Sequence, residues 1–95
     1  MFGKDAIYVR HGHVLIQHNH IRGAFKDGVD LDGSSGEIRH NLFVDCDDEG
    51  IDLSDNHDVK VWQNTIRDRH GGRIAADYDL AQIRLANTLE YSSSD

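Results

Sequence analysis

The chain has 95 residues, which is enough for one small domain at most. Its 17 acidic and 10 basic residues give a net charge of −7, which argues against a nucleic acid or an anionic membrane surface as the partner. The single cysteine, Cys46, excludes an internal disulfide, and the chain shows neither an apolar run long enough for a membrane span nor the apolar stretch of a signal peptide near Met1.

The first predicted strand alternates apolar and polar residues over positions 6–9, a pattern typical of a strand with one buried face. The same alternation returns at positions 28–31 and 50–53, after 22 residues each time. The apolar members expected to face inward are Ile7, Val9, Val29, Leu31, Ile51 and Leu53. The residues between them are expected to form two outward columns, Tyr8, Asp30 and Asp52 in one and Arg10, Asp32 and Ser54 in the other.

A second marker of the repeat is an asparagine that recurs at nearly the same interval. The four residues are Asn19, Asn41, Asn64 and Asn87, spaced by 22, 23 and 23 residues. Asparagine tolerates the left-handed backbone that sharp turns require. We therefore expect each of these residues at a turn, with the side-chain amides hydrogen-bonded to one another as an internal ladder.

The length of the unit defines the fold class. Helix-pair repeats need about 33 or 34 residues, and the leucine consensus of leucine-rich repeats is absent. Three short strands and three turns account well for 22 or 23 residues. We therefore predict an all-β parallel solenoid of about four coils with three strands per coil, forming one domain over residues 1–91 and a frayed tail at 92–95.

The last coil allows two registers. Aligning Gly72 with Gly28 and Gly50, at spacings of 22 and 22, places Arg73 inside the solenoid, where an unpaired charge is costly. A slip of one residue turns Ile74 and Ala76 inward instead. We favour the second register.

The string GVDLDGSSGEIRHNLFVDCDDEGIDLSDNHDVKVWQNTIRD resembles the right-handed parallel β-helix repeat family. That family includes NosD-type periplasmic proteins, pectate and alginate lyases, polygalacturonases and mannuronan C5-epimerases. Its loose consensus is G-I-x-L, a variable turn and then I-x-x-N-x-I, and the resemblance covers roughly residues 6–90. The shared residues build the coil, so the resemblance is specific for fold and weak for function.

Family members usually have eight or more coils with a cap at each end, whereas about four coils without obvious polar caps are predicted here. The resemblance therefore implies a fragment of a longer solenoid, a partner that covers the ends, or end-to-end self-association through exposed strand edges. It also implies an extracytoplasmic location, either secreted or periplasmic.

The pair Asp30 and Asp52 is the sharpest chemical feature of the sequence. Strand spacing in a sheet would place these carboxylates about 5 Å apart. The acidic loop before Gly50 approaches the same edge with Asp45, Asp47, Asp48 and Glu49. We therefore predict a Ca²⁺ site that involves Asp30, Asp52, Asp47 and Asp48, a cation that the resembling uronate lyases often bind on this face. The alternative is that these are ordinary solvated side chains, partly neutralised by Arg10.

Catalysis is a second interpretation of the same face. Glycoside hydrolysis needs two carboxylates, and Asp30 and Asp52, with Arg10 as the single basic residue on that face, are the candidate catalytic residues. The polygalacturonase motifs are out of order, however: His11-Gly12-His13 precedes the carboxylates, and no Arg-x-Lys follows them. This departure weakens the enzyme hypothesis.

Trp62 alternates with an inward valine and should face outward, in one column with Arg39 and Gln17. An exposed aromatic beside an arginine is a common platform for a sugar ring, although another part of a parent protein could equally cover it. The predicted ligand-binding residues are Trp62 and Arg39, together with Tyr8 and Asp32.

The remaining candidates have structural explanations that are at least as good. His11, His13, His18 and His20 cluster in the first coil, and His18 shares a column with His40; this pattern fits copper or zinc binding, or simply outward turn positions. Residues 67–70 form either a basic corner for an acidic sugar or a charged turn. Cys46 is expected near the core.

Three hypotheses of function follow. The first, which we favour, is a non-catalytic module that binds or presents an extended glycan, such as an acidic polysaccharide, along its acidic outer face. The second is a fragment of a polysaccharide lyase, glycoside hydrolase or C5-epimerase. The third is a structural spacer that assembles end to end and binds no ligand.

Overall fold

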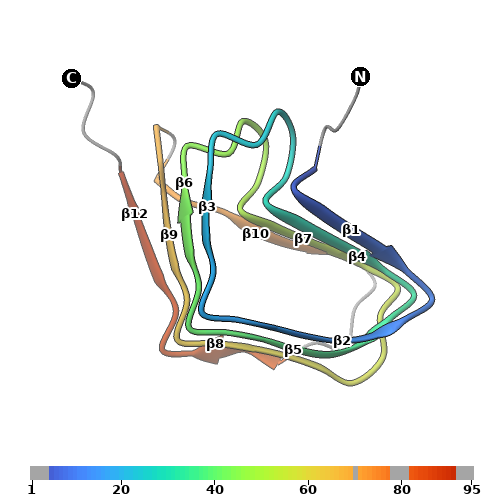
Figure 1. The fold of residues 1–95 in the computed structure, drawn as a ribbon. Helices are drawn as coiled ribbons and strands as arrows, with labels where there is room; N and C mark the ends of the chain where they lie inside the picture. Colours follow the sequence, from blue (N-terminus) through green and yellow to red (C-terminus); the bar gives the residue numbers. More distant parts are fainter. Residues whose placement is uncertain (1–4, 70, 78–81, 92–95) are drawn as a thin grey trace.

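The computed structural model describes residues 5–69, 71–77 and 82–91, which wind as a parallel β-solenoid around an elongated, three-sided interior (Figure 1). The predicted tail at 92–95 and residues 1–4 lie outside this description. Three full turns separate β1 from β10, and β11 and β12 continue into the next turn, so the stack is slightly shorter than the four coils predicted.

Each side of the solenoid is one sheet of four parallel strands. The first sheet consists of β1 (Ile7–Arg10), β4 (Val29–Asp32), β7 (Ile51–Ser54) and β10 (Ile74–Asp77). The second sheet consists of β2 (His13–Gln17), β5 (Ser35–Arg39), β8 (Val59–Trp62) and β11 (Gln82–Leu85). The third sheet consists of β3 (His20–Arg22), β6 (Leu42–Val44), β9 (Thr65–Asp68) and β12 (Thr88–Tyr91).

The core is a stack of the inward residues that the alternation predicts. Val29 pairs with Ile51, and Leu31 with Leu53, and all four side chains are fully buried. The second and third sheets complete each layer with Ile38, Val61, Phe43 and Ile66. Because each strand turns alternate side chains to opposite faces, the intervening residues form the outer surfaces on which the candidate sites lie.

The asparagine ladder is present at the corner between the second and third sheets. Asn41 Nδ2 donates to Asn64 Oδ1 at 2.9 Å, and Asn64 Nδ2 donates to Asn87 Oδ1 at 3.0 Å. The backbone N–H of Asn41 also donates to Asn64 Oδ1, and Asn64 Nδ2 donates to the carbonyl of Ile38, both at 3.0 Å. These contacts satisfy polar groups that a buried corner would otherwise leave unpaired.

We expected the left-handed backbone at this corner to lie at the asparagines. It lies instead at the residue before each of them. The four residues are His18, His40, Gln63 and Ala86, with φ between 53° and 61°. The asparagine follows the sharp turn, and its side chain points inward to hydrogen-bond with the coils on either side. Its repeat therefore reflects the ladder and not backbone tolerance.

A second ladder lies at the corner between the first and second sheets, and the sequence analysis missed it. The backbone N–H of Gly12 donates to Ser34 Oγ at 3.1 Å, and that of Ser34 donates to Asn56 Oδ1 at 2.7 Å. These three residues are 22 positions apart. The interval was visible in the sequence, but the residue type changes at every step and hides the column.

The glycine column has a steric cause. A Cβ on Gly28 would lie 2.5 Å from the ring of Phe43, and a Cβ on Gly50 would lie 2.5 Å from Cγ2 of Ile66. The third-sheet side chains thus occupy the space beside the glycines. Gly72 does not belong to this column. Arg73 takes the place beside Gly50 in the next coil, and the Arg73 carbonyl accepts the N–H of Gly50.

The last coil adopts the register that we favoured. Ile74 pairs with Ile51, and Ala76 with Leu53, so Arg73 lies outside the core. The one-residue slip follows the interval of 23 that the asparagines also show between Asn41 and Asn64.

Candidate functional site

The outer face of the first sheet carries the predicted polar columns. Tyr8 lies beside Asp30, and Asp30 beside Asp52, on successive strands. The next column comprises Arg10, Asp32 and Ser54. Arg10 is therefore in register with Asp32 and not with either member of the carboxylate pair.

A column of three acidic residues lies at the corner before the first sheet, and the sequence analysis did not identify it. The backbone N–H of Asp27 donates to Asp5 Oδ1, and that of Glu49 donates to Asp27 Oδ1, both at 3.0 Å. Asp27 is fully buried. The signal was present in the sequence as an acidic residue directly before Gly28 and again before Gly50.

The electrostatics of this corner disfavour negative charge. Burial raises the pKa of Asp27 to about 7, with further contributions from the neighbouring carboxylates of Asp52, Asp5 and Glu49 and an opposing one from the hydrogen bond that Glu49 donates. Burial and the adjacent Asp52 raise the pKa of Asp30 to about 6. Burial also raises the pKa of Glu49 above its usual range.

We expect the stability of the chain, measured with a chelator present, to fall as the pH rises from about 4 to about 7. The pKa of Asp27 is raised from 3.8 to about 7 in the folded state, so the folded chain retains a proton in this window that the unfolded chain has lost. The stabilisation is complete below the unfolded pKa and is lost as the pH passes the folded one. Denaturant unfolding across this pH range should show the slope, and Asp27→Asn should flatten it; equal slopes in the two proteins would contradict the assignment.

The structure separates the predicted metal ligands. The two groups of three carboxylates whose oxygens lie within 4.8 Å of one another are Asp5, Asp27 and Asp30, and Asp27, Glu49 and Asp52. Asp30 and Asp52 belong to these groups of described residues, whereas Asp47 and Asp48 do not. Asp48 instead lies 4.0 Å from the guanidinium of Arg73.

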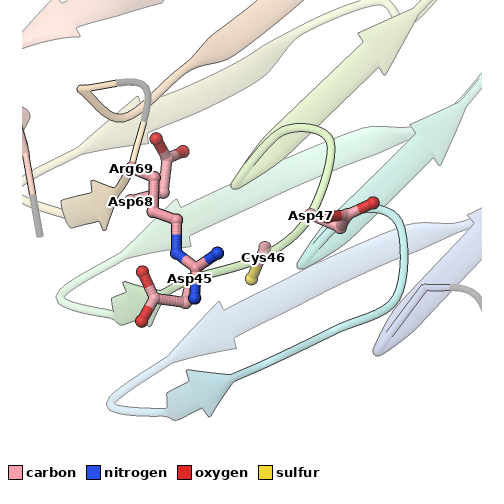
Figure 2. A pocket seen from close by; sticks show the side chains of 5 residues that line it. All are labelled: Asp45, Cys46, Asp47, Asp68 and Arg69. Carbon is pink, nitrogen blue, oxygen red and sulfur yellow. The ribbon is translucent and has the colours of Figure 1, made fainter. Parts of the chain in front are cut away.

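Asp47 lines a small pocket of about 170 Å³ together with Asp45, Cys46, Asp68 and Arg69 (Figure 2). Cys46 is buried, as predicted, and burial raises the pKa of its thiol above the usual range. The thiol therefore remains protonated at neutral pH and is a poor nucleophile.

In the described part of residues 67–70, Arg67 and Asp68 end β9 and Arg69 lies in the turn that follows. Arg67 Nε contacts Glu90 Oε1 at 2.6 Å, and buried Asp68 accepts the backbone N–H of Gly72 at 3.0 Å. His70 lies outside the described residues. Arg67 and Asp68 are thus engaged within the solenoid itself.

The outer face of the second sheet carries the predicted column of Gln17, Arg39 and Trp62. Arg39 Nε donates to Gln17 Oε1 at 2.8 Å, and Trp62 Nε1 donates to Glu37 Oε1 at 2.9 Å. Arg39 also contacts Glu37 at 3.3 Å. This contact joins the column of Arg39 to the neighbouring column, in which Glu37 pairs with Lys60. The half-buried indole is therefore fixed at its polar edge by a hydrogen bond.

Two cations approach the same indole ring. Lys60 Nζ lies 4.7 Å and the guanidinium carbon of Arg39 6.0 Å from the ring centroid, distances at which a cation is attracted to the π face. The hydrogen bond from Trp62, with the positive charge of Arg39 and Lys60, lowers the pKa of Glu37. Glu37 is thus an anion at neutral pH and can accept the hydrogen bond of the indole N–H.

An open groove of about 350 Å³ adjoins this cluster on the same face. Its walls include Leu15, Glu37, Arg39 and Lys60. Leu15 is 54% exposed, so the groove combines an apolar contact with hydrogen-bond donors and acceptors.

The four predicted ligand-binding residues consequently fall on two faces. Tyr8 and Asp32 lie on the first sheet, whereas Arg39 and Trp62 lie on the second. These faces meet at a corner of the solenoid, so the four residues do not line one small site. Only Arg39 and Trp62 belong to a contiguous cluster with a groove.

The histidines form a partial column. The rings of His18 and His40 stack with centroids 5.3 Å apart, and His40 contacts Trp62 edge to face at 5.1 Å. His13 Nδ1 lies 2.8 Å from Ser35 Oγ. Within the described residues, the groups of three with metal-ligand spacing contain carboxylates and no histidine.

The stacked sheets, ladders and outward columns define a solenoid repeat protein. Within that class, the chain belongs to the family described as the right-handed β-helix region, whose model matches residues 2–89. This match confirms the family and the right-handed winding that the resemblance implied. No curated protein and no solved structure matches the chain. The described part of the chain contains no helix with the length and apolar character needed to cross a membrane.

Proposed function

We propose that the chain is a non-catalytic glycan-binding module and that the outer face of the second sheet is its binding surface. The observation that carries this proposal is the half-buried indole of Trp62, held by Glu37 and flanked by Lys60 and Arg39 beside an open groove. A sugar ring presents apolar C–H groups to an aromatic side chain and hydroxyl groups to charged neighbours. Both kinds of partner are present here.

Pre-organisation supports binding at this face. A side chain that is already fixed loses little conformational freedom when a ligand arrives. The ion pair of Arg39 and Glu37 and the hydrogen bond to Trp62 fix three long side chains across adjacent strands. Successive strands lie about 4.8 Å apart, so an extended polymer lying across the strands would meet Gln17, Arg39 and Trp62 in turn.

The acidic first sheet is a weaker candidate for the glycan surface than we predicted. Burial raises the pKa of Asp30 to about 6, and Arg10 lies beside Asp32 and away from the Asp30–Asp52 pair. Elimination from a uronate polymer would need a basic group beside both carboxylates. The geometry therefore supports binding on the second sheet more strongly than elimination on the first.

Trp62 is the only tryptophan, so the intrinsic fluorescence of the chain reports directly on the proposed surface. We expect a panel of neutral and acidic polysaccharides to include at least one that shifts this emission in a saturable manner. Trp62→Ala should then weaken binding, measured by calorimetry, roughly 30-fold, because loss of a central aromatic anchor costs about 2 kcal/mol.

The matched control is Tyr8→Ala, which removes another exposed aromatic side chain from the first sheet. It should leave the affinity unchanged. Equal losses in both variants would contradict the assigned surface, and the absence of binding to every polymer, with concentration-dependent association, would favour the spacer hypothesis. Shortening of any polymer during the incubation would show that the chain is catalytic.

A further inference from the structure

The buried carboxylate of Asp27 has one oxygen without a hydrogen-bond partner. Oδ1 accepts the backbone N–H of Glu49 at 3.0 Å, whereas Oδ2 is buried and accepts no hydrogen bond from the described residues. Asp27 as a whole has 0% of its surface exposed. A buried polar atom that lacks a partner is uncommon and indicates an ion or water at that position.

The surroundings of Asp27 supply further oxygen ligands. Carboxylate oxygens of Asp27, Glu49 and Asp52 all lie within 4.8 Å of one another. Calcium binds oxygen at about 2.4 Å, so two ligands on opposite sides of one ion would be about 4.8 Å apart. The three oxygens are therefore close enough to share a single Ca²⁺ ion.

The cationic side chains nearby do not take this position. Arg73 lowers the pKa of Glu49, but its guanidinium lies beside Asp48, at 4.0 Å. Lys26 acts on Asp30 in the adjacent group. Neither side chain donates a hydrogen bond to Asp27 among the contacts of the described residues.

We propose that Asp27, Glu49 and Asp52 bind one Ca²⁺ ion, which joins two successive coils at the corner before the first sheet. Three anionic ligands suit a hard divalent cation, and water can complete the six to eight positions that Ca²⁺ takes. The ion supplies the partner that Asp27 Oδ2 lacks. Of the four ligands that the sequence predicted, only Asp52 belongs to this set; Asp27 and Glu49 replace Asp30, Asp47 and Asp48. This site lies on another face from Trp62 and is independent of the glycan-binding proposal.

The test uses the whole chain and Ca²⁺ alone. Calorimetry should show saturable Ca²⁺ binding, and the melting temperature should rise with CaCl₂ beyond the rise produced by NaCl at equal ionic strength, since a ligand specific for the folded state stabilises it. Asp27→Asn keeps the Oδ1 acceptor for Glu49 but removes the central charge. We expect it to weaken Ca²⁺ binding at least about tenfold, because affinity depends on the number of charged ligands.

Asp32→Asn is the matched control, since Asp32 lies on the same sheet but outside the ligand group. It should retain the calcium response. Should Asp27→Asn fail to fold, the outward Asp52→Asn variant decides the question, with the same expected loss. The proposal is overturned if the wild-type chain binds no Ca²⁺ by calorimetry, or if the folded ligand variants respond to Ca²⁺ as the wild type does.

Discussion

Replacement of Leu53 by aspartate should unfold the chain at room temperature. Leu53 is fully buried on the inner face of β7, where it pairs with Leu31. The change removes a buried apolar side chain and places a carboxylate in an interior without a cation, at a combined cost of about 5 kcal/mol or more. Small domains are stabilised by only about 5–15 kcal/mol in total. Far-ultraviolet circular dichroism should show the loss of strand signal.

Leu15→Asp provides the matched control for this experiment. The same substitution can be made at Leu15, which lies on the outer face of β2 and whose side chain is 54% exposed. The control should fold and should unfold at nearly the wild-type denaturant concentration. A stable Leu53→Asp variant would mean that the inner and outer faces of the first sheet are assigned wrongly.

Replacement of Asn64 by alanine should have the second largest effect. Asn64 is 1% exposed, and its side chain accepts from the backbone and the side chain of Asn41 and donates to Ile38 and Asn87. Alanine removes four hydrogen bonds from this buried corner, each worth about 0.5–1.5 kcal/mol, and takes away the acceptor of the backbone N–H of Asn41. We therefore expect the free energy of unfolding, from denaturant titration, to fall by about 3 kcal/mol or more.

The control for the ladder is Asn19→Ala at its exposed end. Asn19 is exposed and donates to Gln17 and Asn41, so water can replace its contacts when it is removed. We expect a cost well below that at Asn64. Similar costs at the two positions would show that the ladder does not act through burial.

The sequence predicted the fold well because the interval of the repeat indicates which residues pair between successive coils. Val29, Leu31, Ile51 and Leu53 recur at one interval and alternate with polar residues, so both the strand and its inward face can be read directly. The last coil was harder because the interval there is 23. The cost of burying Arg73 was nevertheless enough to select the observed register, with Ile74 facing inward.

The turns were less predictable than the strands. The left-handed backbone lies at His40 and Gln63 and not at the asparagines that follow them, because the role of those asparagines is the ladder. The column of Gly12, Ser34 and Asn56 keeps its interval but changes its residue type at each coil. The hydrogen bonds between coils repeat here with different residue types in each coil. A search for one recurring residue type therefore could not identify this column.

The candidate sites were predicted only in part, for a related reason. Outward direction follows from alternation, which correctly grouped Arg39 with Trp62 and Asp30 with Asp52. Alternation does not say which sheet a strand joins, and for this reason Tyr8 and Trp62 were combined in one predicted set. The importance of Asp27 depends on its burial at a corner, which a sequence does not display.

The most direct test of the proposed function is a two-dimensional ¹H–¹⁵N spectrum of the labelled chain, recorded during titration with the polysaccharide that shifts its fluorescence. Trp62 provides the single indole N–H resonance, so its signal can be followed without ambiguity. Binding at the second sheet predicts that this resonance and the side-chain signals of Gln17 and Arg39 shift together, while the amides of Tyr8 and Asp32 stay in place. Shifts confined to Tyr8, Asp30 and Asp32, with an unchanged indole resonance, would contradict the assignment of the glycan surface to the second sheet.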